Sequence, residues 1–378
     1  MTLHVVTGRA NAGKTGVAYK RLRSAVSEGR RAVLVLPAVP DVERARREFS
    51  QSSQLGIEIT TFGGLVSSRW EETGDGRAIV TPAQRAILLE LLSSATGQSR
   101  GLARLASGCV DALTEGSGSD WRAVRGRVSP AGAALADLLD AYALELDRRG
   151  LVEMPEATRL LGQCVGEQGQ VLVVHRFTDF TPSQVALIRA MSEKDDVTVT
   201  LTWDEEFAPT CVLTEILHEL GKFSSTHVSE TTSYTPPALD KVGNELFIDA
   251  GSLNRDPTLR LGLAEGEAAQ ARLVADEIAL ALSSGVAESA ERIAVVCRDL
   301  AQHYSALRSA LEQAGQAAQF DMPMPFAAAP LGAALLDGLA FAFSGERSRL
   351  LRLLRSPFSA VERLEARRLE QRWRKRGL

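Results

Sequence analysis

The chain opens with the stretch Leu3-His4-Val5-Val6-Thr7-Gly8-Arg9-Ala10-Asn11-Ala12-Gly13-Lys14-Thr15. Its second half, from Gly8 to Thr15, fits the pattern G-x-x-x-x-G-K-[ST]. An apolar, strand-like run precedes the pattern, and a helix-like run from Gly16 to Leu22 follows it. Strand, loop and helix in this order are the context in which the pattern binds phosphate groups. We therefore predict a phosphate-binding loop after the first strand of an α/β sheet, with a glycine-rich turn as the plainer interpretation.

The loop residues have distinct expected roles toward ATP and Mg²⁺. Glycines let backbone N–H groups turn inward around the phosphates, and the start of the following helix adds a partial positive charge. Lys14 is expected to place its charge on the β- and γ-phosphates, and Thr15 to offer its hydroxyl to Mg²⁺. The nucleotide-binding residues predicted here are Gly8, Arg9, Ala10, Asn11, Ala12, Gly13, Lys14 and Thr15.

The acidic partner of such a loop is missing from the sequence. A hydrolysing enzyme of this type needs a carboxylate at the end of a nearby strand to hold Mg²⁺. The best candidate strand, Val171 to Val174, ends in His175 and Arg176. A cation there opposes Mg²⁺, and His175 itself is interpreted as capping a strand end. Binding and hydrolysis of a nucleotide are therefore separate questions, and no catalytic residue is predicted.

Composition limits the remaining possibilities. With 378 residues the chain is expected to form two or three domains. Hydrophobic residues make up 45% and no apolar stretch approaches the ~18 residues of a membrane span. Four widely spaced cysteines indicate reduced thiols of a cytoplasmic protein rather than a metal site. The net charge of −4 restricts any nucleic-acid binding to local patches.

The order of apolar runs predicts an α/β fold with a parallel sheet and two main parts. Residues 1–80 and 168–205 are expected to form a P-loop domain, and 81–167 a helical insertion without strands, starting at the helix cap Thr81. Residues 206–256, including Ser224 to Thr226, are expected to be loop. A second RecA-like α/β domain is predicted for 257–378, incomplete, with strands at Leu259–Leu263 and Arg292–Cys297.

Several segments together resemble the core of UvrD-like superfamily 1 helicases, in the degraded form of AddB-type subunits of helicase–nucleases. Gly8 to Thr15 is similar to their Walker A motif, and Thr61-Phe62-Gly63-Gly64-Leu65 to a T-F-x-x-L segment that contacts DNA. Phe177, Asp179 and Gln184 fall in register with motif II, D-E-F-Q-D-T-x-x-x-Q, while His175 and Arg176 replace its acidic pair. Arg292 to Asp299 resembles motif IV.

This resemblance implies a function in double-strand-break repair by homologous recombination. The chain would be a pseudo-helicase subunit that binds DNA through Thr61 and Phe62, binds nucleotide with the help of Arg298, and works with a helicase–nuclease partner. The family's motifs V and VI and its PD-(D/E)XK nuclease domain would lie beyond residue 378. Two alternatives stay open: a stand-alone P-loop ATPase, and a non-enzymatic scaffold with a relic loop.

Overall fold

The computed structural model describes residues 3–51, 56–115, 129–164, 169–203, 212–228, 242, 259–322 and 326–375. The chain divides into two compact units, Met1–Leu259 and Arg260–Leu378. Each unit is considered by itself below.

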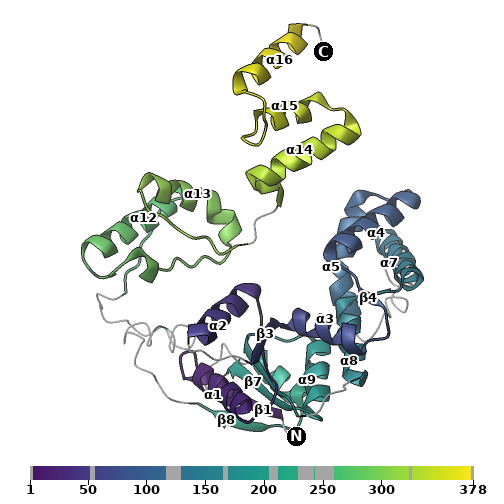
Figure 1. Ribbon diagram of the computed structural model, residues 1–378, viewed down its shortest axis with the longest axis vertical. Coiled ribbons are helices and arrows are strands. Elements are labelled where there is room, and N and C mark those ends of the chain that lie inside the picture. The colour runs from purple at the N-terminus through teal and green to yellow at the C-terminus, as the bar shows by residue number, and fades with distance from the viewer. Residues whose placement is uncertain are drawn as a thin grey trace. The chain divides into compact units, whose positions relative to one another are not determined.

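A six-stranded parallel sheet forms the centre of the first unit (Figure 1). The strands lie in the order β3 (Ile57–Thr61), β2 (Ala32–Leu36), β6 (Val171–Phe177), β7 (Asp196–Thr202), β1 (Leu3–Gly8) and β8 (Ser224–His227). The predicted α/β class with a parallel sheet is therefore confirmed. One strand, β7, separates β1 from β6.

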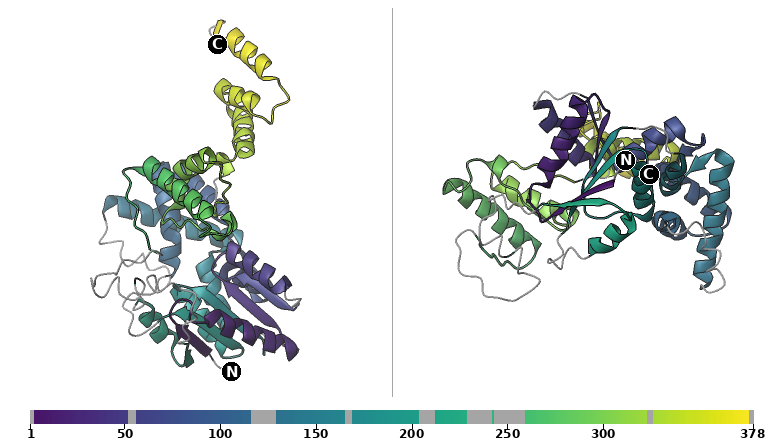
Figure 2. Two further views of the ribbon diagram at one scale, coloured as in Figure 1. Left: turned by 90° about the vertical axis from the view of Figure 1, so that its left-hand side faces the viewer. Right: turned by 90° about the horizontal axis from the view of Figure 1, so that it is seen from below.

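Helices cover both faces of this sheet, so its inner strands are buried on both sides. On one face, α1 (Lys14–Ser27) and α2 (Val39–Gln51) bury residues such as Leu22 and Phe49 against Leu34 and Val173. On the other face, α3 (Phe62–Thr73), α8 (Met154–Cys164), α9 (Pro182–Ser192) and α10 (Val212–Leu220) pack on a larger core. Figure 2 shows helices on either side of the strands.

The direction of the chain gives the two ends of this sheet opposite character. After a parallel strand, each covering helix runs back, so its N-terminus lies at the carboxyl edge of the sheet and its C-terminus at the amino edge. The carboxyl edge here includes the segment after Gly8 and the end of β6 at Phe177. The amino edge includes Gln170 and Asp195, which directly precede β6 and β7.

A helical block lies between α3 and α8 in the sequence, inside the range 81–167 that was predicted as an insertion. It consists of α4 (Pro82–Ala95), α5 (Arg100–Glu115) and α7 (Pro130–Arg149), with its own apolar core that includes Leu89 and Leu138. Thr81 caps α4 in a capping box with Gln84, as its sequence position predicted. The prediction that this region has no strand is wrong in one detail: Leu151–Val152 (β5) pairs with Ala78–Ile79 (β4).

The loop predicted around Ser224 is also wrong. Ser224–His227 forms β8, which pairs in parallel with β1 at the edge of the sheet. All four residues are exposed, so no apolar alternation marks the strand, and its pairing depends on the neighbouring strand alone. Within the predicted junction, 206–256, the loop prediction is also wrong for Val212–Leu220, which forms α10. Residues 206–211, 229–241 and 243–256 lie outside the described part of the chain.

The second unit is helical in its described residues, 260–322 and 326–375, and no strand is present there. Its helices are α12 (Glu267–Ser283), α13 (Leu300–Gln313), α14 (Pro330–Ser344), α15 (Arg347–Arg355) and α16 (Arg363–Lys375), with 3₁₀ turns η3 (Ala290–Arg292) and η4 (Phe326–Ala328). The strands predicted at Leu259–Leu263 and Arg292–Cys297 are wrong. Leu261 is 88% and Val296 91% exposed, because these apolar segments find no ladder partner among the described residues. The second RecA-like domain stays a prediction.

Candidate functional site

The candidate site is the loop that leaves β1 at the carboxyl edge of the sheet. Gly8 adopts a φ of +153°, and a Cβ there would lie 2.4 Å from the carbonyl oxygen of Val228, so only glycine fits. Gly13 adopts a φ of 90° and is the N-cap of α1, which begins at Lys14. The loop therefore turns sharply twice and delivers the chain directly into a helix N-terminus, as the sequence pattern predicted.

Lys14 folds back over its own loop. Its Nζ donates hydrogen bonds to the carbonyl oxygen of Gly8 at 2.8 Å and to that of Arg9. The residue is only 9% exposed, and this burial lowers the pKa of the ammonium group to about 8. Because the charged form is disfavoured by lost solvation, an anion placed beside Nζ would stabilise it.

The other loop residues differ in their access to solvent. Ala10, Asn11 and Thr15 are exposed, Arg9 is half-buried, and Ala12 is buried. The hydroxyl group of Thr15, predicted to contact Mg²⁺, is thus reachable at the first turn of α1. Asn11 holds a positive φ of 62°, which asparagine tolerates better than most residues.

His175 lies two residues before the end of β6, on the face of the sheet that α1 covers. Its Nδ1 forms a hydrogen bond with Thr200 Oγ1 at 2.7 Å, and its ring meets the edge of Tyr19 with 6.1 Å between centroids. The residue is 3% exposed, and no hydrogen-bond partner for Nε2 is present in the described part of the structure. Burial, with the charges of Arg176 and Lys14, lowers the pKa of His175 to about 4. The imidazole is therefore neutral at pH 7.

A β-bulge separates His175 from the end of its strand. Between Val174 and Phe177 the pairing with β7 shifts, so that three steps along β6 oppose two along β7. Arg176 occupies the bulge with a positive φ of 69°, is exposed, and forms an ion pair with Asp41 at 3.1 Å. Where a hydrolysing enzyme would carry its metal-binding carboxylates, this strand thus ends in a neutral imidazole and a guanidinium group.

The carboxylates of Asp41 and Asp179, near this strand end, bind other groups of the protein. Asp179 Oδ1 accepts a hydrogen bond from the backbone N–H of Phe180 at 2.8 Å, which favours its interpretation as a turn-stabilising residue. Among the described residues, no group of three or more histidine, cysteine, aspartate or glutamate side chains is arranged to hold a metal ion. Cys109 and Cys297 are free thiols, while Cys211 and the side chain of Cys164 lie outside the described part.

Thr61 and Phe62, predicted to bind DNA, have structural roles at the same edge. The Thr61 hydroxyl caps α3 by accepting a hydrogen bond from the N–H of Gly64 at 3.1 Å. Phe62 is 6% exposed and its ring packs edge-on against Phe177, with 6.1 Å between centroids. A base cannot stack on so buried a ring, so stacking by Phe62 is incompatible with this arrangement. A contact of this segment with DNA by other atoms stays a prediction.

Arg298, predicted to assist in nucleotide binding, belongs to the second unit. It is exposed and lies just before α13, whose N-cap is the neighbouring Asp299. Its role toward a nucleotide stays a prediction.

The sequence did not point to Thr200, the partner of His175. A signal was present in the alternation Val197-Thr198-Val199-Thr200, which places two threonines on one face of an otherwise apolar strand. Both are buried, at 0% and 2% exposure, and Thr200 forms the hydrogen bond with His175. Threonines that alternate with valines in this buried strand thus indicated a polar side chain that could pair with His175.

A comparison with protein-family models and with curated proteins finds no match for this chain. Within the described residues, every helix is too short or too polar to cross a bilayer.

Proposed function

We propose that this chain binds a nucleoside polyphosphate at the Gly8–Thr15 loop, with little or no hydrolysis, and holds single-stranded DNA as a helicase-like subunit. The observation that carries the nucleotide part is the geometry of Lys14. A buried lysine with a depressed pKa lies at a glycine-shaped loop and at the start of α1. Backbone N–H groups, the helix N-terminus and the ammonium group all favour an anion at one place.

The absence of turnover follows from the end of β6. Hydrolysis requires a metal ion held against the phosphates and a positioned water molecule. His175 is neutral and buried, and Arg176 carries a positive charge that is directed to Asp41. Mg²⁺ that arrives with ATP would find the Thr15 hydroxyl and the phosphates as ligands. We therefore expect Mg²⁺ to change the affinity for ATP by less than about tenfold.

Calorimetric titration with ATP and ADP, in EDTA and in Mg²⁺, tests the nucleotide site. Lys14→Ala should weaken binding about 10- to 100-fold, because a hydrogen bond to a charged group contributes about 1.5–3 kcal/mol. Lys20→Ala is the matched control, since Lys20 is exposed on the same helix and carries the same charge. Equal titrations of the wild-type protein and Lys14→Ala would assign the loop a structural role only.

Turnover is measured separately. The purified chain should hydrolyse ATP far more slowly than the ~1 s⁻¹ of working enzymes, with or without DNA. A DNA-stimulated rate at or above that value, lost in Lys14→Ala, would instead support the stand-alone ATPase.

The DNA part of the proposal rests on the resemblance to AddB-type subunits, whose partner chain would supply unwinding and cleavage. Because the net charge is −4, any affinity must come from a local basic patch. Fluorescence anisotropy with labelled oligonucleotides should show binding without sequence preference that weakens as salt rises, since phosphate contacts release counterions. If a folded sample binds no oligonucleotide at low salt, alone or with a helicase partner, the scaffold alternative is favoured.

A further inference from the structure

A cavity lies at the end of the sheet opposite to the Gly8–Thr15 loop, at the amino edge. Its volume is about 380 Å³. That is more than twice the roughly 150 Å³ of an engineered apolar cavity that binds benzene. Its walls come from α3, α8 and α9, and from the residues that precede β6 and β7. It is therefore separate from the Gly8–Thr15 loop and plays no part in the proposed function.

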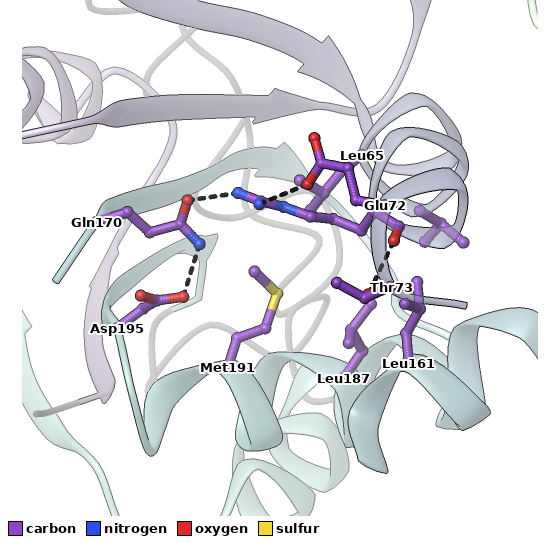
Figure 3. Close-up of a pocket in the computed structure, with 10 residues that line it drawn as sticks. Leu65, Glu72, Thr73, Leu161, Gln170, Leu187, Met191 and Asp195 are labelled. Carbon is purple, nitrogen blue, oxygen red and sulfur yellow. Dashed lines mark hydrogen bonds and ion pairs between the residues drawn. The ribbon is translucent and has the colours of Figure 1, made fainter. Parts of the chain in front are cut away.

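Apolar side chains form most of this cavity. Leu65 and Val66 of α3 face Leu161 of α8 and Leu187 and Met191 of α9. Figure 3 shows Leu161, Leu187 and Met191 directed from their helices into the same space. The thioether of Met191 is a favourable neighbour for an aromatic ring. An aromatic or branched apolar body fits this lining.

One end of the cavity is polar, and carboxylates outnumber cations among the residues that line it. Gln170 accepts a hydrogen bond from Arg69 Nη2 at 2.7 Å and donates one to Asp195 Oδ2 at 2.6 Å (Figure 3). Arg69 also pairs with Glu72 at 3.1 Å. The lining therefore contains one cation and two carboxylates, Glu72 and Asp195, of which Asp195 is 1% exposed.

The helices add to this negative character. α3 ends at Thr73 and α9 at Ser192, so both present their C-terminal ends near the cavity. Each helix C-terminus carries a partial negative charge that favours cations by about 0.3–1 kcal/mol at exposed positions. Carboxylates and helix ends thus act in the same direction.

We propose that this cavity is a binding site for a small organic cation, an amphiphile with an aromatic body and an ammonium group. The aromatic body would lie among Leu65, Leu161, Leu187 and Met191, and the ammonium group would approach Asp195 and Glu72 at the polar end.

Three probes of similar size test the proposal: 3-phenylpropylamine, 3-phenylpropanol and 3-phenylpropionate. In calorimetric or ligand-observed NMR titrations of the full chain, the amine should bind at least tenfold more tightly than the carboxylate, with the alcohol between them. Binding of the carboxylate as tight as that of the amine would overturn the proposal, as would saturable binding of none of the three.

Variants separate the charge from the apolar lining. Asp195→Asn should reduce the affinity for the amine about tenfold and leave that for the alcohol nearly unchanged. Glu72→Gln, at a more exposed position, should produce a smaller change in the same direction and serves if Asp195→Asn folds poorly. Leu187→Trp should fill the cavity and abolish binding of all three probes. An amine that keeps its full affinity in both charge variants would overturn the assignment of the ammonium group.

Lys14→Ala distinguishes this site from the nucleotide site. It should leave the amine titration unchanged while it weakens that of ATP. Either site can therefore fail its own test without affecting the other.

Discussion

The covering helices give the two edges of the central sheet opposite partial charges, although the same strands and helices build both edges. At the carboxyl edge, α1 begins at a loop with the buried cation Lys14, and α9 begins where Glu115 accepts hydrogen bonds from Ser183 N and Oγ at 3.1 and 2.9 Å. At the amino edge, Asp195 and Glu72 lie beside the ends of α9 and α3. The helices that cover a parallel sheet all run antiparallel to its strands. Their dipoles therefore add partial positive charge at the carboxyl edge and partial negative charge at the amino edge.

Glu115 shows what this difference means for ligands. At α9, a carboxylate of the protein itself supplies the anion that a helix N-terminus favours. At α1, the first residue of the helix is Lys14, whose ammonium group makes the local charge more positive. The same edge thus has one N-terminus neutralised from within and one that favours an anion from outside.

Phe62→Ala should produce the largest loss of stability, because Phe62 is a large buried side chain. The variant tests whether the carboxyl edge depends on packing. The ring is buried against Phe177, which in turn stacks on Phe180 with 5.1 Å between centroids. Removing such a ring lowers the free energy of unfolding by about 3–5 kcal/mol. Urea denaturation should show this loss, whereas Leu144→Ala, at a 67% exposed position, should change stability by less than about 0.5 kcal/mol. A fully stable Phe62→Ala protein with reduced DNA binding would restore the DNA-contact role.

A fall in pH should lower the free energy of unfolding through protonation of His175. The folded protein holds its pKa at about 4, below the ordinary value of 6.5, so the unfolded chain binds a proton first as the pH falls. Stability contributed by the neutral ring is present above pH 6.5 and is lost as the pH falls toward 4. Between pH 7 and pH 5, the free energy of unfolding should fall by about 2 kcal/mol more in the wild-type protein than in His175→Gln.

Urea denaturation of both proteins across this pH range measures the difference. Parallel pH profiles of His175→Gln and the wild-type protein would show that His175 titrates normally and that the buried polar contact with Thr200 is not maintained.

Two glycine substitutions test whether the shape of the loop requires glycine at Gly8 but not at Gly16. Gly8→Ala introduces a methyl group 2.4 Å from the Val228 carbonyl oxygen at a φ of +153°, and should destabilise the protein by about 1–3 kcal/mol. Gly16→Ala places its methyl group in open space on α1 and should stabilise the protein by about 0.5–1 kcal/mol. Thermal unfolding of the two variants should give opposite shifts of the melting temperature, and a neutral Gly8→Ala would contradict the close approach of Val228 to the loop.

The smallest effect is expected from Glu115→Gln, which leaves the shape of the α9 N-terminus but removes the charge. The loss should be about 0.3–1 kcal/mol and should shrink at high salt. Glu90→Gln, at an exposed position on α4, is the control that should leave stability unchanged. A larger loss in the control than in Glu115→Gln would argue against the electrostatic difference between the edges.

Local patterns predicted the elements that local chemistry determines. The Gly8–Thr15 loop and the Thr81 cap were found where the sequence placed them, because turn geometry and capping are encoded within a few residues. The strand β8 was missed and the strands at Leu259 and Arg292 were wrong, because pairing depends on a distant segment. At the candidate site, the positions of Lys14 and His175 followed from the sequence. The contact of His175 with Thr200 and the bulge at Arg176 did not, since both arise from the register between β6 and β7.

The bulge at Arg176 adds one residue to β6 and therefore reverses which face of the sheet the following side chain points to. Alternation along a regular strand would direct Phe177 to the same face as His175, toward α1. With the extra residue, Phe177 instead joins the core under α3 and α9, opposite Leu201. The inserted residue, Arg176, packs in the core of neither face. Its guanidinium group can therefore remain exposed near the end of a buried strand. The replacement of the expected acidic pair by His175 and Arg176 is thus accompanied by a shift in register, which moves Phe177 to the other face of the sheet.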